Sequence, residues 1–300
     1  MSDSQRYVVV TGGSQGIGLA TVQKLARYAQ RTAPGYNIVI ASRNQQVSAQ
    51  AVAKIKADTP DAQIEAMPLD LSSFASVRQF AAAYKAKGYP LHVLINNAGG
   101  MIYGKQARFS SDGFELTLQT NHLGHFLLTN LLLDLLKEST PAHIVNVSSQ
   151  THIPGFGGGP PPHFDIDNLQ AEKYYDARVF YKTVKLITMW FSYEMQRRCT
   201  SSGVTSNAMC PGFVPQSIGE RRTSPLSRFL YLQVLPRMPF ARSLDQAATS
   251  LVYAATDPAM EGVGGKFIVD CKEKRSSDES YDEQKASKLW DLSWQWCGLH

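Results

Sequence analysis

The sequence has few cysteines, no dense run of one charge and no long apolar stretch, and each deficit excludes a class of protein. Its four cysteines show no C-x-x-C spacing, so neither a disulfide framework nor a zinc site is predicted. Lysine and arginine are scattered, apart from the short run 272–275, which acidic residues flank. A nucleic-acid partner is therefore not indicated. No 18 consecutive residues are apolar, so no transmembrane segment is predicted.

The overall composition is that of a soluble globular chain. Apolar residues make up 43% of the 300 residues, charged residues make up 18%, and the formal net charge is only +5. No secretory signal precedes the first apolar run, and the cysteines read as reduced thiols. We therefore expect a cytoplasmic protein without a bound metal.

Short β-branched runs alternate with helical stretches along the chain, and no linker divides them. Several of the runs are apolar at consecutive positions, as expected for strands covered on both faces. The pattern predicts one α/β domain over 1–300 with a doubly wound parallel sheet. The expected strands are 7–11, 37–41, 64–68, 92–96, 143–148, 204–209 and 266–269. The expected helices are 16–28, 46–58, 73–87, 121–137, 180–197 and 245–255.

Two irregular segments interrupt this alternation, at 151–179 and 213–242. The first contains a Gly/Pro-rich run and the second an apolar run at 229–235. Both follow strands, so both are expected to wall a substrate pocket. A surface loop and a core-packing helix are equally good readings. For 229–235, a pocket lid or an oligomer contact is favoured over membrane binding. Residues 272–300 form a C-terminal extension.

One glycine-rich loop follows the first expected strand and opens the first expected helix. It runs Thr11-Gly12-Gly13-Ser14-Gln15-Gly16-Ile17-Gly18. Glycines allow a tight turn and let a diphosphate approach the backbone, while the helix N-terminus supplies unpaired N–H groups and a positive dipole end. In this strand–turn–helix context the loop predicts dinucleotide binding.

The residues after the second expected strand indicate which dinucleotide binds. An acidic residue there would bind the ribose 2′-hydroxyl of NAD, whereas an arginine accommodates the 2′-phosphate of NADP. The sequence has Arg43 at this place and no acid. We therefore expect NADP(H), with Ser14 and Ser42 adding hydrogen bonds.

A tyrosine and a lysine four positions apart form the most informative pair in the chain. Tyr181 and Lys185 share one face of an expected helix. A free tyrosine hydroxyl has a pKa of about 10, and a neighbouring cation lowers that pKa because it favours the phenolate. The pair is therefore suited to passing a proton to or from a substrate oxygen. The same spacing also arises by chance on helix surfaces, so its context matters.

Polar residues follow several expected strands at the point where each strand ends. Asn97 follows the fourth strand, Ser149 the fifth and Pro211-Gly212 the sixth, while Asn121 begins an apolar helix. Singly, such residues usually form caps or turns. Because parallel strands end at one edge of the sheet, these residues are expected to lie at the same edge as the glycine loop.

Taken in order, these motifs resemble the short-chain dehydrogenase/reductase family over residues 7–270. The loop 11–18, the pair Asp70-Leu71, the run Asn97-Ala98-Gly99 and Tyr181-x-x-x-Lys185 are similar to the family's signatures. The closest likeness is to the retinol dehydrogenase-like reductases, over segments 165–174, 265–272 and 288–293. The resemblance implies a Rossmann-type fold.

The resemblance also implies a role for each matching residue. Ser149 hydrogen-bonds the substrate oxygen, Tyr181 transfers the proton, and Lys185 holds the ribose and polarises the tyrosine. Asn121 supports a proton relay through water. The implied cofactor contacts are Gly12, Ser14, Gln15, Gly16, Ile17, Gly18, Arg43, Asp70, Leu71, Asn97, Ala98, Gly99, Tyr181, Lys185, Pro211, Gly212 and Val214.

Three departures from the family pattern stand out. Val184 replaces the usual serine or threonine before the lysine, and Gln216 stands where a threonine commonly contacts the nicotinamide, with Ser217 beside it. Ser149 and Tyr181 lie 32 positions apart, which is longer than usual and reflects the Gly/Pro-rich insertion.

The expected function is that of an NADP(H)-dependent carbonyl reductase or alcohol dehydrogenase acting on an apolar ketone, aldehyde or alcohol. Two alternatives stay open, namely a non-redox NADP(H)-binding sensor or scaffold, and a cofactor-guided isomerase or cyclase. The resemblance implies a homodimer or homotetramer through helices 121–137 and 180–197. His122 and His125 are expected to pack in the core or an interface, and His152 and His163 receive no role.

Overall fold

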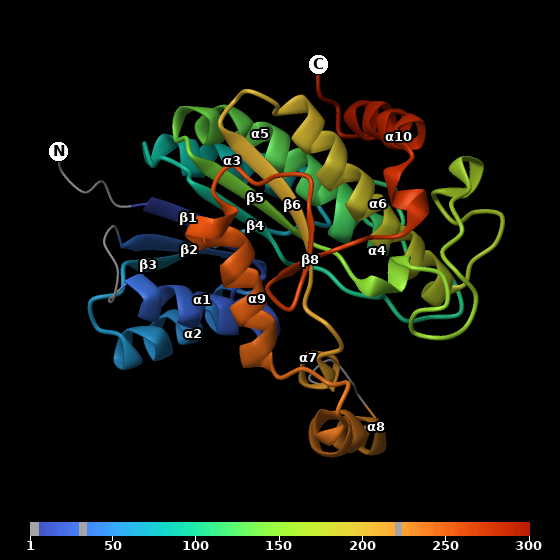
Figure 1. Cartoon of the computed structure of the whole chain (residues 1–300), viewed down its shortest axis with the longest axis horizontal. Helices are drawn as coiled ribbons and strands as arrows, with labels where there is room; N and C mark the ends of the chain where they lie inside the picture. The colour runs from blue at the N-terminus through green and yellow to red at the C-terminus, as the bar shows by residue number, and fades with distance from the viewer. Residues whose placement is uncertain (1–5, 30–34, 220–223) are drawn as a thin grey trace.

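The centre of the protein is an eight-stranded sheet in a computed structural model that describes residues 6–29, 35–219 and 224–300 (Figure 1). The strand order is β3-β2-β1-β4-β5-β6-β7-β8, parallel except for the β7–β8 pair. The strands are β1 (Arg6–Thr11), β2 (Tyr36–Ser42), β3 (Ile64–Pro68), β4 (Val93–Asn96), β5 (Ala142–Val147), β6 (Val204–Cys210), β7 (Phe267–Val269) and β8 (Lys272–Lys274). The single α/β domain and its seven expected strands are confirmed; β8 was not predicted.

Helices cover both faces of the sheet and divide the core into two layers (Figure 1). In β1, Val8 and Val10 face one layer and Val9 faces the other, so the buried centre of the strand is apolar at consecutive positions. One layer contains α1 (Gly16–Ala29), α2 (Gln45–Asp58) and α9 (Leu244–Thr256). The other contains α3 (Phe74–Ala86), α5 (Gly124–Glu138), α6 (Ala177–Arg198) and α10 (Glu283–Trp296).

Side-chain caps fix where several helices begin. Asn44 accepts the N–H of Val47 at α2, and Ser243 forms a capping box at α9. The Asp176 carboxylate accepts two backbone N–H groups of the first turn of α6. For this reason α6 begins at Ala177, three residues before the expected start.

The helix expected from Asn121 begins differently. A short α4 (Leu116–Leu118) leads into a π-helical turn, η1 (Gln119–Leu123), and only then into α5. The π turn places Asn121 at a distortion, and such turns are frequent at functional sites.

The two interrupting segments differ from each other. Residues 151–176 form irregular backbone, turns and two 3₁₀ turns, η2 (Gln150–His152) and η3 (Ile166–Asn168), and α6 takes up the last three residues of the segment. The irregular structure expected for the Gly/Pro run is therefore confirmed. The irregular structure expected for 213–242 is wrong, because its local apolar spacing is helical. The described residues there form α7 (Pro215–Gly219), α8 (Pro225–Phe229), the π turn η4 (Leu230–Val234) and the 3₁₀ turn η5 (Leu235–Arg237).

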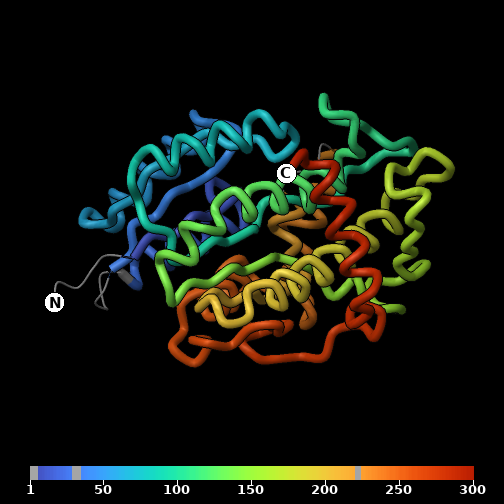
Figure 2. The backbone as a smooth tube through the Cα atoms, turned by 90° about the horizontal axis from the view of Figure 1, so that it is seen from above, coloured from blue at the N-terminus to red at the C-terminus, as the bar shows by residue number. Residues whose placement is uncertain are grey.

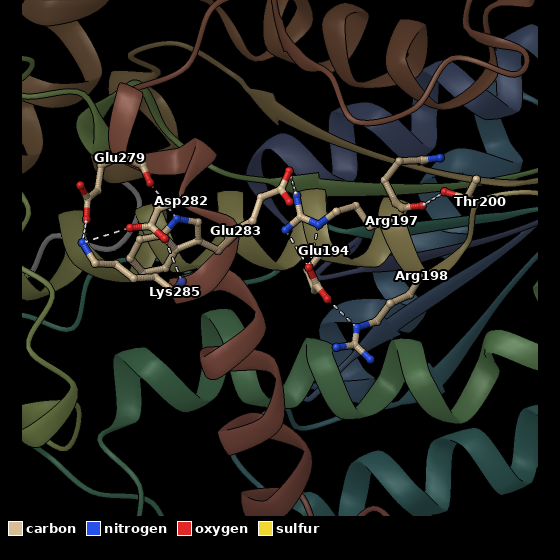
Figure 3. Close-up of polar contacts among 10 residues, drawn as sticks. Glu194, Arg197, Arg198, Thr200, Glu279, Asp282, Glu283 and Lys285 are labelled. Carbon is tan, nitrogen blue, oxygen red and sulfur yellow. Dashed lines mark hydrogen bonds and ion pairs between the residues drawn. The ribbon is translucent and has the colours of Figure 1, made fainter.

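The C-terminal extension packs onto the domain and is part of its core. After the 3₁₀ turns η6 (Pro258–Met260) and η7 (Asp278–Tyr281), α10 lies across α6, and the ring of Trp290 stacks on Phe191 at 6.1 Å. Glu194 pairs with Arg197 and Arg198, and Arg197 also reaches Glu283 at 3.6 Å (Figure 3). Among the helices of the described residues, none combines the length and apolar character needed to cross a bilayer.

Candidate active site

The glycine loop closes tightly between β1 and α1. Gly12 has φ 66°, which favours glycine, and its N–H donates to the Ala41 carbonyl at 2.8 Å. A Cβ on Gly18 would lie 2.2 Å from the Gly12 carbonyl oxygen and 2.6 Å from Nδ2 of Asn97. The first turn of α1 therefore packs directly on the loop and leaves bare backbone at a helix N-terminus. This arrangement fits the diphosphate of a dinucleotide.

Thr11 ties the glycine loop to the end of β4. Its Oγ1 accepts the backbone N–H groups of Asn97 and Ala98, both at 2.9 Å, and its carbonyl accepts Nδ2 of Asn97 at 2.8 Å. The Asn97 side chain thus holds two loops together. The expected position of Asn97, Ala98 and Gly99 at the edge of the sheet is observed, and their contact with a cofactor stays a prediction.

The side chain of Asn121 bonds to the loop after β4. Its Oδ1 accepts the N–H of Gly100 at 2.9 Å, and its Nδ2 donates to the carbonyls of Gly100 at 3.0 Å and Thr117 at 2.9 Å. A Cβ on Gly99 would lie 2.4 Å from Oδ1, so a glycine is needed here. The π turn brings α5 into contact with the carboxyl end of β4.

Tyr181 and Lys185 lie against the end of β5. The Lys185 ammonium is buried, donates to the Val147 carbonyl at 3.0 Å and lies 5.5 Å from the centroid of the Tyr181 ring. Ser148 Oγ donates to the Lys185 carbonyl at 2.8 Å, which fixes α6 against the strand. Val184 is fully buried in the core, which accounts for an apolar residue at that position.

Ser149 begins the 3₁₀ turn that follows β5. Its Oγ accepts the N–H of Thr151 at 3.3 Å, so its own hydroxyl proton remains available for donation. The expected edge of the sheet therefore holds Ser149, Asn121, Tyr181 and Lys185 on three neighbouring elements, namely the start of η2, η1 and α6.

A residue without a predicted role, His152, holds the Ser149 backbone. Nε2 of His152 accepts the N–H of Ser277 at 3.2 Å, so Nδ1 carries the proton and donates to the Ser149 carbonyl at 2.5 Å. The ring is buried, and burial lowers the pKa of His152. No local sequence pattern predicts this contact, because Ser277 lies 125 positions away in the C-terminal extension.

The expected adenosine end of the site is more exposed. Arg43 is exposed and, within the described residues, forms no ion pair. Ser42 Oγ is hydrogen-bonded to Ser48 Oγ, which itself donates to the Asn44 carbonyl, and the contact of Ser42 with a cofactor stays a prediction. The Asp70 carboxylate accepts the N–H and hydroxyl of Ser72, and Leu71 is buried under Gly124.

The loop after β6 completes the edge. Cys210 Sγ accepts the N–H groups of Gln150 and Gly212, both at 3.3 Å, and so joins the loops after β5 and β6. Pro211 and Gly212 directly follow β6, as the sequence predicts. Val214 is buried, and Gln216 is half-buried on α7. In the glycine loop, Ser14 is buried and Gln15 is exposed, and both directly precede Gly16 and Ile17 at the start of α1.

Comparison with known proteins agrees with this geometry. The family model described as short chain dehydrogenase matches residues 6–160. The chain belongs to the short-chain dehydrogenase/reductase family. It is retinol dehydrogenase-like: it is 38% identical to human polyprenol dehydrogenase over 98% of its length and 86% of that protein, and 37% identical to bovine retinol dehydrogenase 12 over 98% and 87%.

Solved structures place this short-chain dehydrogenase in the same fold. A putative uncharacterized protein from Mycobacterium paratuberculosis superposes with a TM-score of 0.71 at 29% identity, covering 99% of this chain and 95% of the other. The Pseudomonas aeruginosa RhlG/NADP active-site complex gives a TM-score of 0.66 at 25% identity, covering 88% and 94%. The structural likeness therefore extends over nearly the whole chain.

A pocket of about 240 Å³ lies beside the dehydrogenase's expected reaction centre but on a different face of α6. Its lining includes Val179, Phe180 and Thr183 and excludes Tyr181 and Lys185. The segment 151–179 bounds this pocket. Lys182 of α6 holds that segment in place, because its ammonium donates to the carbonyls of Gly158 at 2.6 Å and Pro160 at 2.8 Å. This pocket is a space under the insertion, and neither Tyr181 nor Lys185 lines it.

Two buried histidines of the dehydrogenase pack in its core, as the sequence predicts. His125 Nε2 is 2.9 Å from Thr11 Oγ1, and His122 Nε2 is 2.8 Å from Ser293 Oγ on α10. Burial lowers the pKa of His125 to about 4 and that of His122 to about 3. Both rings are therefore neutral in the folded protein at neutral pH.

These neutral histidines predict a pH dependence of stability. Below pH 6.5 the unfolded chain binds protons on His122 and His125 that the folded chain excludes. The free energy of unfolding should therefore fall as the pH drops from 6.5 toward 4, by about 1.4 kcal/mol per pH unit for each histidine. Urea unfolding at a series of pH values measures this slope. The double variant His122→Gln/His125→Gln should show a shallower slope, and the exposed His163→Gln should keep the wild-type slope. Equal slopes for the wild type and both variants would contradict the prediction.

Proposed function

We propose that this short-chain dehydrogenase is an NADP(H)-dependent carbonyl reductase or alcohol dehydrogenase acting on an apolar ketone, aldehyde or alcohol. The observation that carries the proposal is the buried Lys185 ammonium, 5.5 Å from the Tyr181 ring centroid at the carboxyl end of β5. The names of two relatives, polyprenol dehydrogenase and retinol dehydrogenase 12, support an apolar alcohol or its carbonyl.

The residues at this edge have complementary tasks in the proposed reaction. Bound NADPH supplies the hydride, and the reverse reaction returns it. The Tyr181 hydroxyl protonates the substrate oxygen, and the Lys185 cation stabilises the negative charge left on the phenolate. Ser149, whose oxygen accepts the N–H of Thr151, donates a hydrogen bond to the same substrate oxygen and keeps its proton. Asn121 holds the loop after β4 in place and supports proton return to Tyr181.

NADP(H) is the proposed cofactor because the end of β2 offers a cation and no acid. Arg43 is exposed directly after the strand, and its guanidinium suits a 2′-phosphate better than the two hydroxyls of NAD. The segments 151–179 and 213–242 are proposed to shape the substrate entrance, since both leave carboxyl ends of strands that border this edge.

Reversing the charge at the end of β2 should reverse the cofactor preference. Arg43→Asp removes the charge-assisted hydrogen bonds to a 2′-phosphate, so KM for NADPH should rise about 10- to 100-fold. KM for NADH should stay level or fall, because the new carboxylate accepts from the ribose hydroxyls. Steady-state kinetics with both cofactors measure the two values. Arg43→Lys keeps the charge and should change KM for NADPH less; equal effects on both cofactors would contradict the assignment.

A library of apolar ketones and aldehydes, screened for loss of NADPH absorbance, tests the proposed function directly. Transfer of deuterium from labelled NADPH to the product establishes net reduction. Tight NADPH binding without turnover of any carbonyl compound would overturn the proposal in favour of a sensor or scaffold. Turnover without net deuterium transfer would favour a cofactor-guided isomerase or cyclase.

A further inference from the structure

The helical segment formed by α8 and η4 exposes an apolar stripe that the protein does not cover. None of the residues of α8, η4 or η5 is buried, although most of them are apolar. Leu226, Phe229 and Leu230 stand at positions i, i+3 and i+4, so they share one face of the helix. Their exposed fractions are 79%, 59% and 41%. We call these three residues the α8 stripe.

Exposed apolar side chains concentrate around the α8 stripe. Met238 and Phe240, on the segment returning from η5, are also exposed. Together with the stripe they make five of the eleven large exposed apolar residues of the described chain, within 15 positions. Scattered exposed apolar residues are ordinary, but a concentration of this kind marks a binding surface. In Figure 1, α8 projects from the body of the molecule beyond α7, away from the sheet.

The opposite side of the same helical segment packs against the protein. A Cβ on Gly219 of α7 would lie 2.8 Å from Cδ2 of Leu232 and 2.9 Å from Cβ of Tyr231, so η4 rests closely on α7. The centroid of the Tyr231 ring lies 6.5 Å from that of Phe213, which stands three residues after the end of β6. One face of the segment is therefore anchored, and the α8 stripe is the face turned outward.

The charged residues of the segment 224–244, which carries the α8 stripe, are all arginines. Residues 224–244 contain three arginines and no acid. Arg242 pairs with Asp270 at 2.9 Å. Arg228 and Arg237 are exposed and form no ion pair with any residue that the structure describes. An apolar stripe flanked by exposed cations matches a bilayer that carries anionic headgroups over an apolar interior.

A second copy of the chain fits this surface less well. A symmetric contact centred on the α8 stripe would place the arginines of one copy close to those of the other, with no acid in the segment to pair with them. We infer that the α8 stripe docks the protein on an anionic lipid membrane, with Leu226, Phe229 and Leu230 in the acyl boundary and Arg228 and Arg237 at the headgroups.

Docking at this place has a consequence for the substrate, which rests on the function proposed above. The segment starts at Phe213, close to Cys210, whose thiol accepts the N–H of Gln150 next to Ser149. The α8 stripe thus belongs to the same loop that borders the reaction edge, so docking would bring an apolar carbonyl compound or alcohol dissolved in the bilayer close to that edge. The substrate class inferred here is a membrane-dissolved lipid.

Flotation of the full chain with vesicles tests the docking without any assay of activity. The protein should float with phosphatidylcholine vesicles that contain phosphatidylserine, and less with phosphatidylcholine alone or at high salt. Leu226→Ser/Phe229→Ser and, separately, Arg228→Glu/Arg237→Glu should each weaken binding roughly tenfold or more. Because the altered side chains are exposed, thermal unfolding of both variants should match that of the wild type.

Matched substitutions elsewhere on the surface distinguish docking through the α8 stripe from non-specific binding to vesicles. Phe109 is 50% exposed, and Phe109→Ser should float like the wild type. Lys54→Glu reverses an exposed charge on α2 and should also leave flotation unchanged. Wild-type protein that stays unbound, or stripe variants that float as well as the controls, would overturn the inference. Self-association that the stripe variants abolish, without flotation, would overturn it in favour of a second copy.

Activity in two formats distinguishes failure of docking from failure of the proposed function. The stripe variants should lose at least about tenfold more of the turnover of a long-chain aldehyde dissolved in vesicles than of the turnover of a small water-soluble aldehyde. Loss of both activities to the same extent would contradict delivery from the membrane. If no carbonyl compound is reduced by the wild type while flotation is intact, the proposed function fails and the docking surface stands.

Discussion

Tyr181→Phe is expected to lower kcat by about 10²- to 10⁴-fold, because the substitution removes the hydroxyl that exchanges a proton with the substrate oxygen. The ring remains, so the packing of α6 and the contact with the Lys185 ammonium are kept. The affinity for NADPH, measured by fluorescence titration, should change little. Single-turnover kinetics then assign the loss to the chemical step.

The same substitution elsewhere on α6 provides a control. Tyr193 is buried on this helix, and its hydroxyl is 2.8 Å from Ser276 Oγ, far from the β5 end. Tyr193→Phe removes one buried hydrogen bond, which costs about 1 kcal/mol of stability, and should leave kcat unchanged. A fully active Tyr181→Phe, or equal losses of kcat in both variants, would contradict the proposed proton transfer.

The sheet could be predicted from the sequence because burial on both faces leaves a clear trace in it. A strand such as Val8–Val10 sends alternate residues into two core layers, so every position must be apolar. The glycine loop could also be predicted, since a Cβ on Gly12 or Gly18 would lie too close to neighbouring backbone atoms. In each of these cases one local constraint dictates the residue type.

Other features depend on contacts between distant segments, and those leave no local pattern. The π turn at Asn121 follows from hydrogen bonds to Gly100 and Thr117, and the role of His152 depends on Ser277. Strand β8 has three exposed charged or polar residues, Lys272–Lys274, and exists because it pairs with β7. The α8 helix was missed since its apolar spacing is exposed, while sequence patterns are read on the assumption of burial.

The C-terminal extension bears on the oligomer that the family resemblance implies. Helix α10 packs across α6, and α3 packs against α5 (Figure 2), so the chain itself covers part of the helices expected to meet a second subunit. Trp290 on α10 lies against both Phe126 and Phe191. A homodimer or homotetramer would therefore need surfaces of these helices that α10 leaves open, and it stays a prediction.

Two lysines of α6 allow the second large effect to be tested cleanly. Lys182 and Lys185 are both 5% exposed, three positions apart. The ammonium of Lys185 reaches Val147 and the Tyr181 ring, whereas that of Lys182 reaches Gly158 and Pro160 in the insertion. The pair therefore matches in residue type, burial and helix but differs in which part of the molecule its charge holds.

Lys185→Met should lower kcat about 10²- to 10³-fold and raise KM for NADPH, since it removes the cation that stabilises the phenolate and holds the ribose. The melting temperature should not fall, because methionine fills the same space without a buried charge to desolvate. Lys182→Met should keep kcat within a few-fold and instead alter KM across substrates of different size, because it releases the 151–179 segment. Steady-state kinetics and thermal unfolding on both variants measure these values. Equal losses of kcat would mean that any buried cation on α6 suffices and that the Tyr181–Lys185 pair has no special place in the reaction.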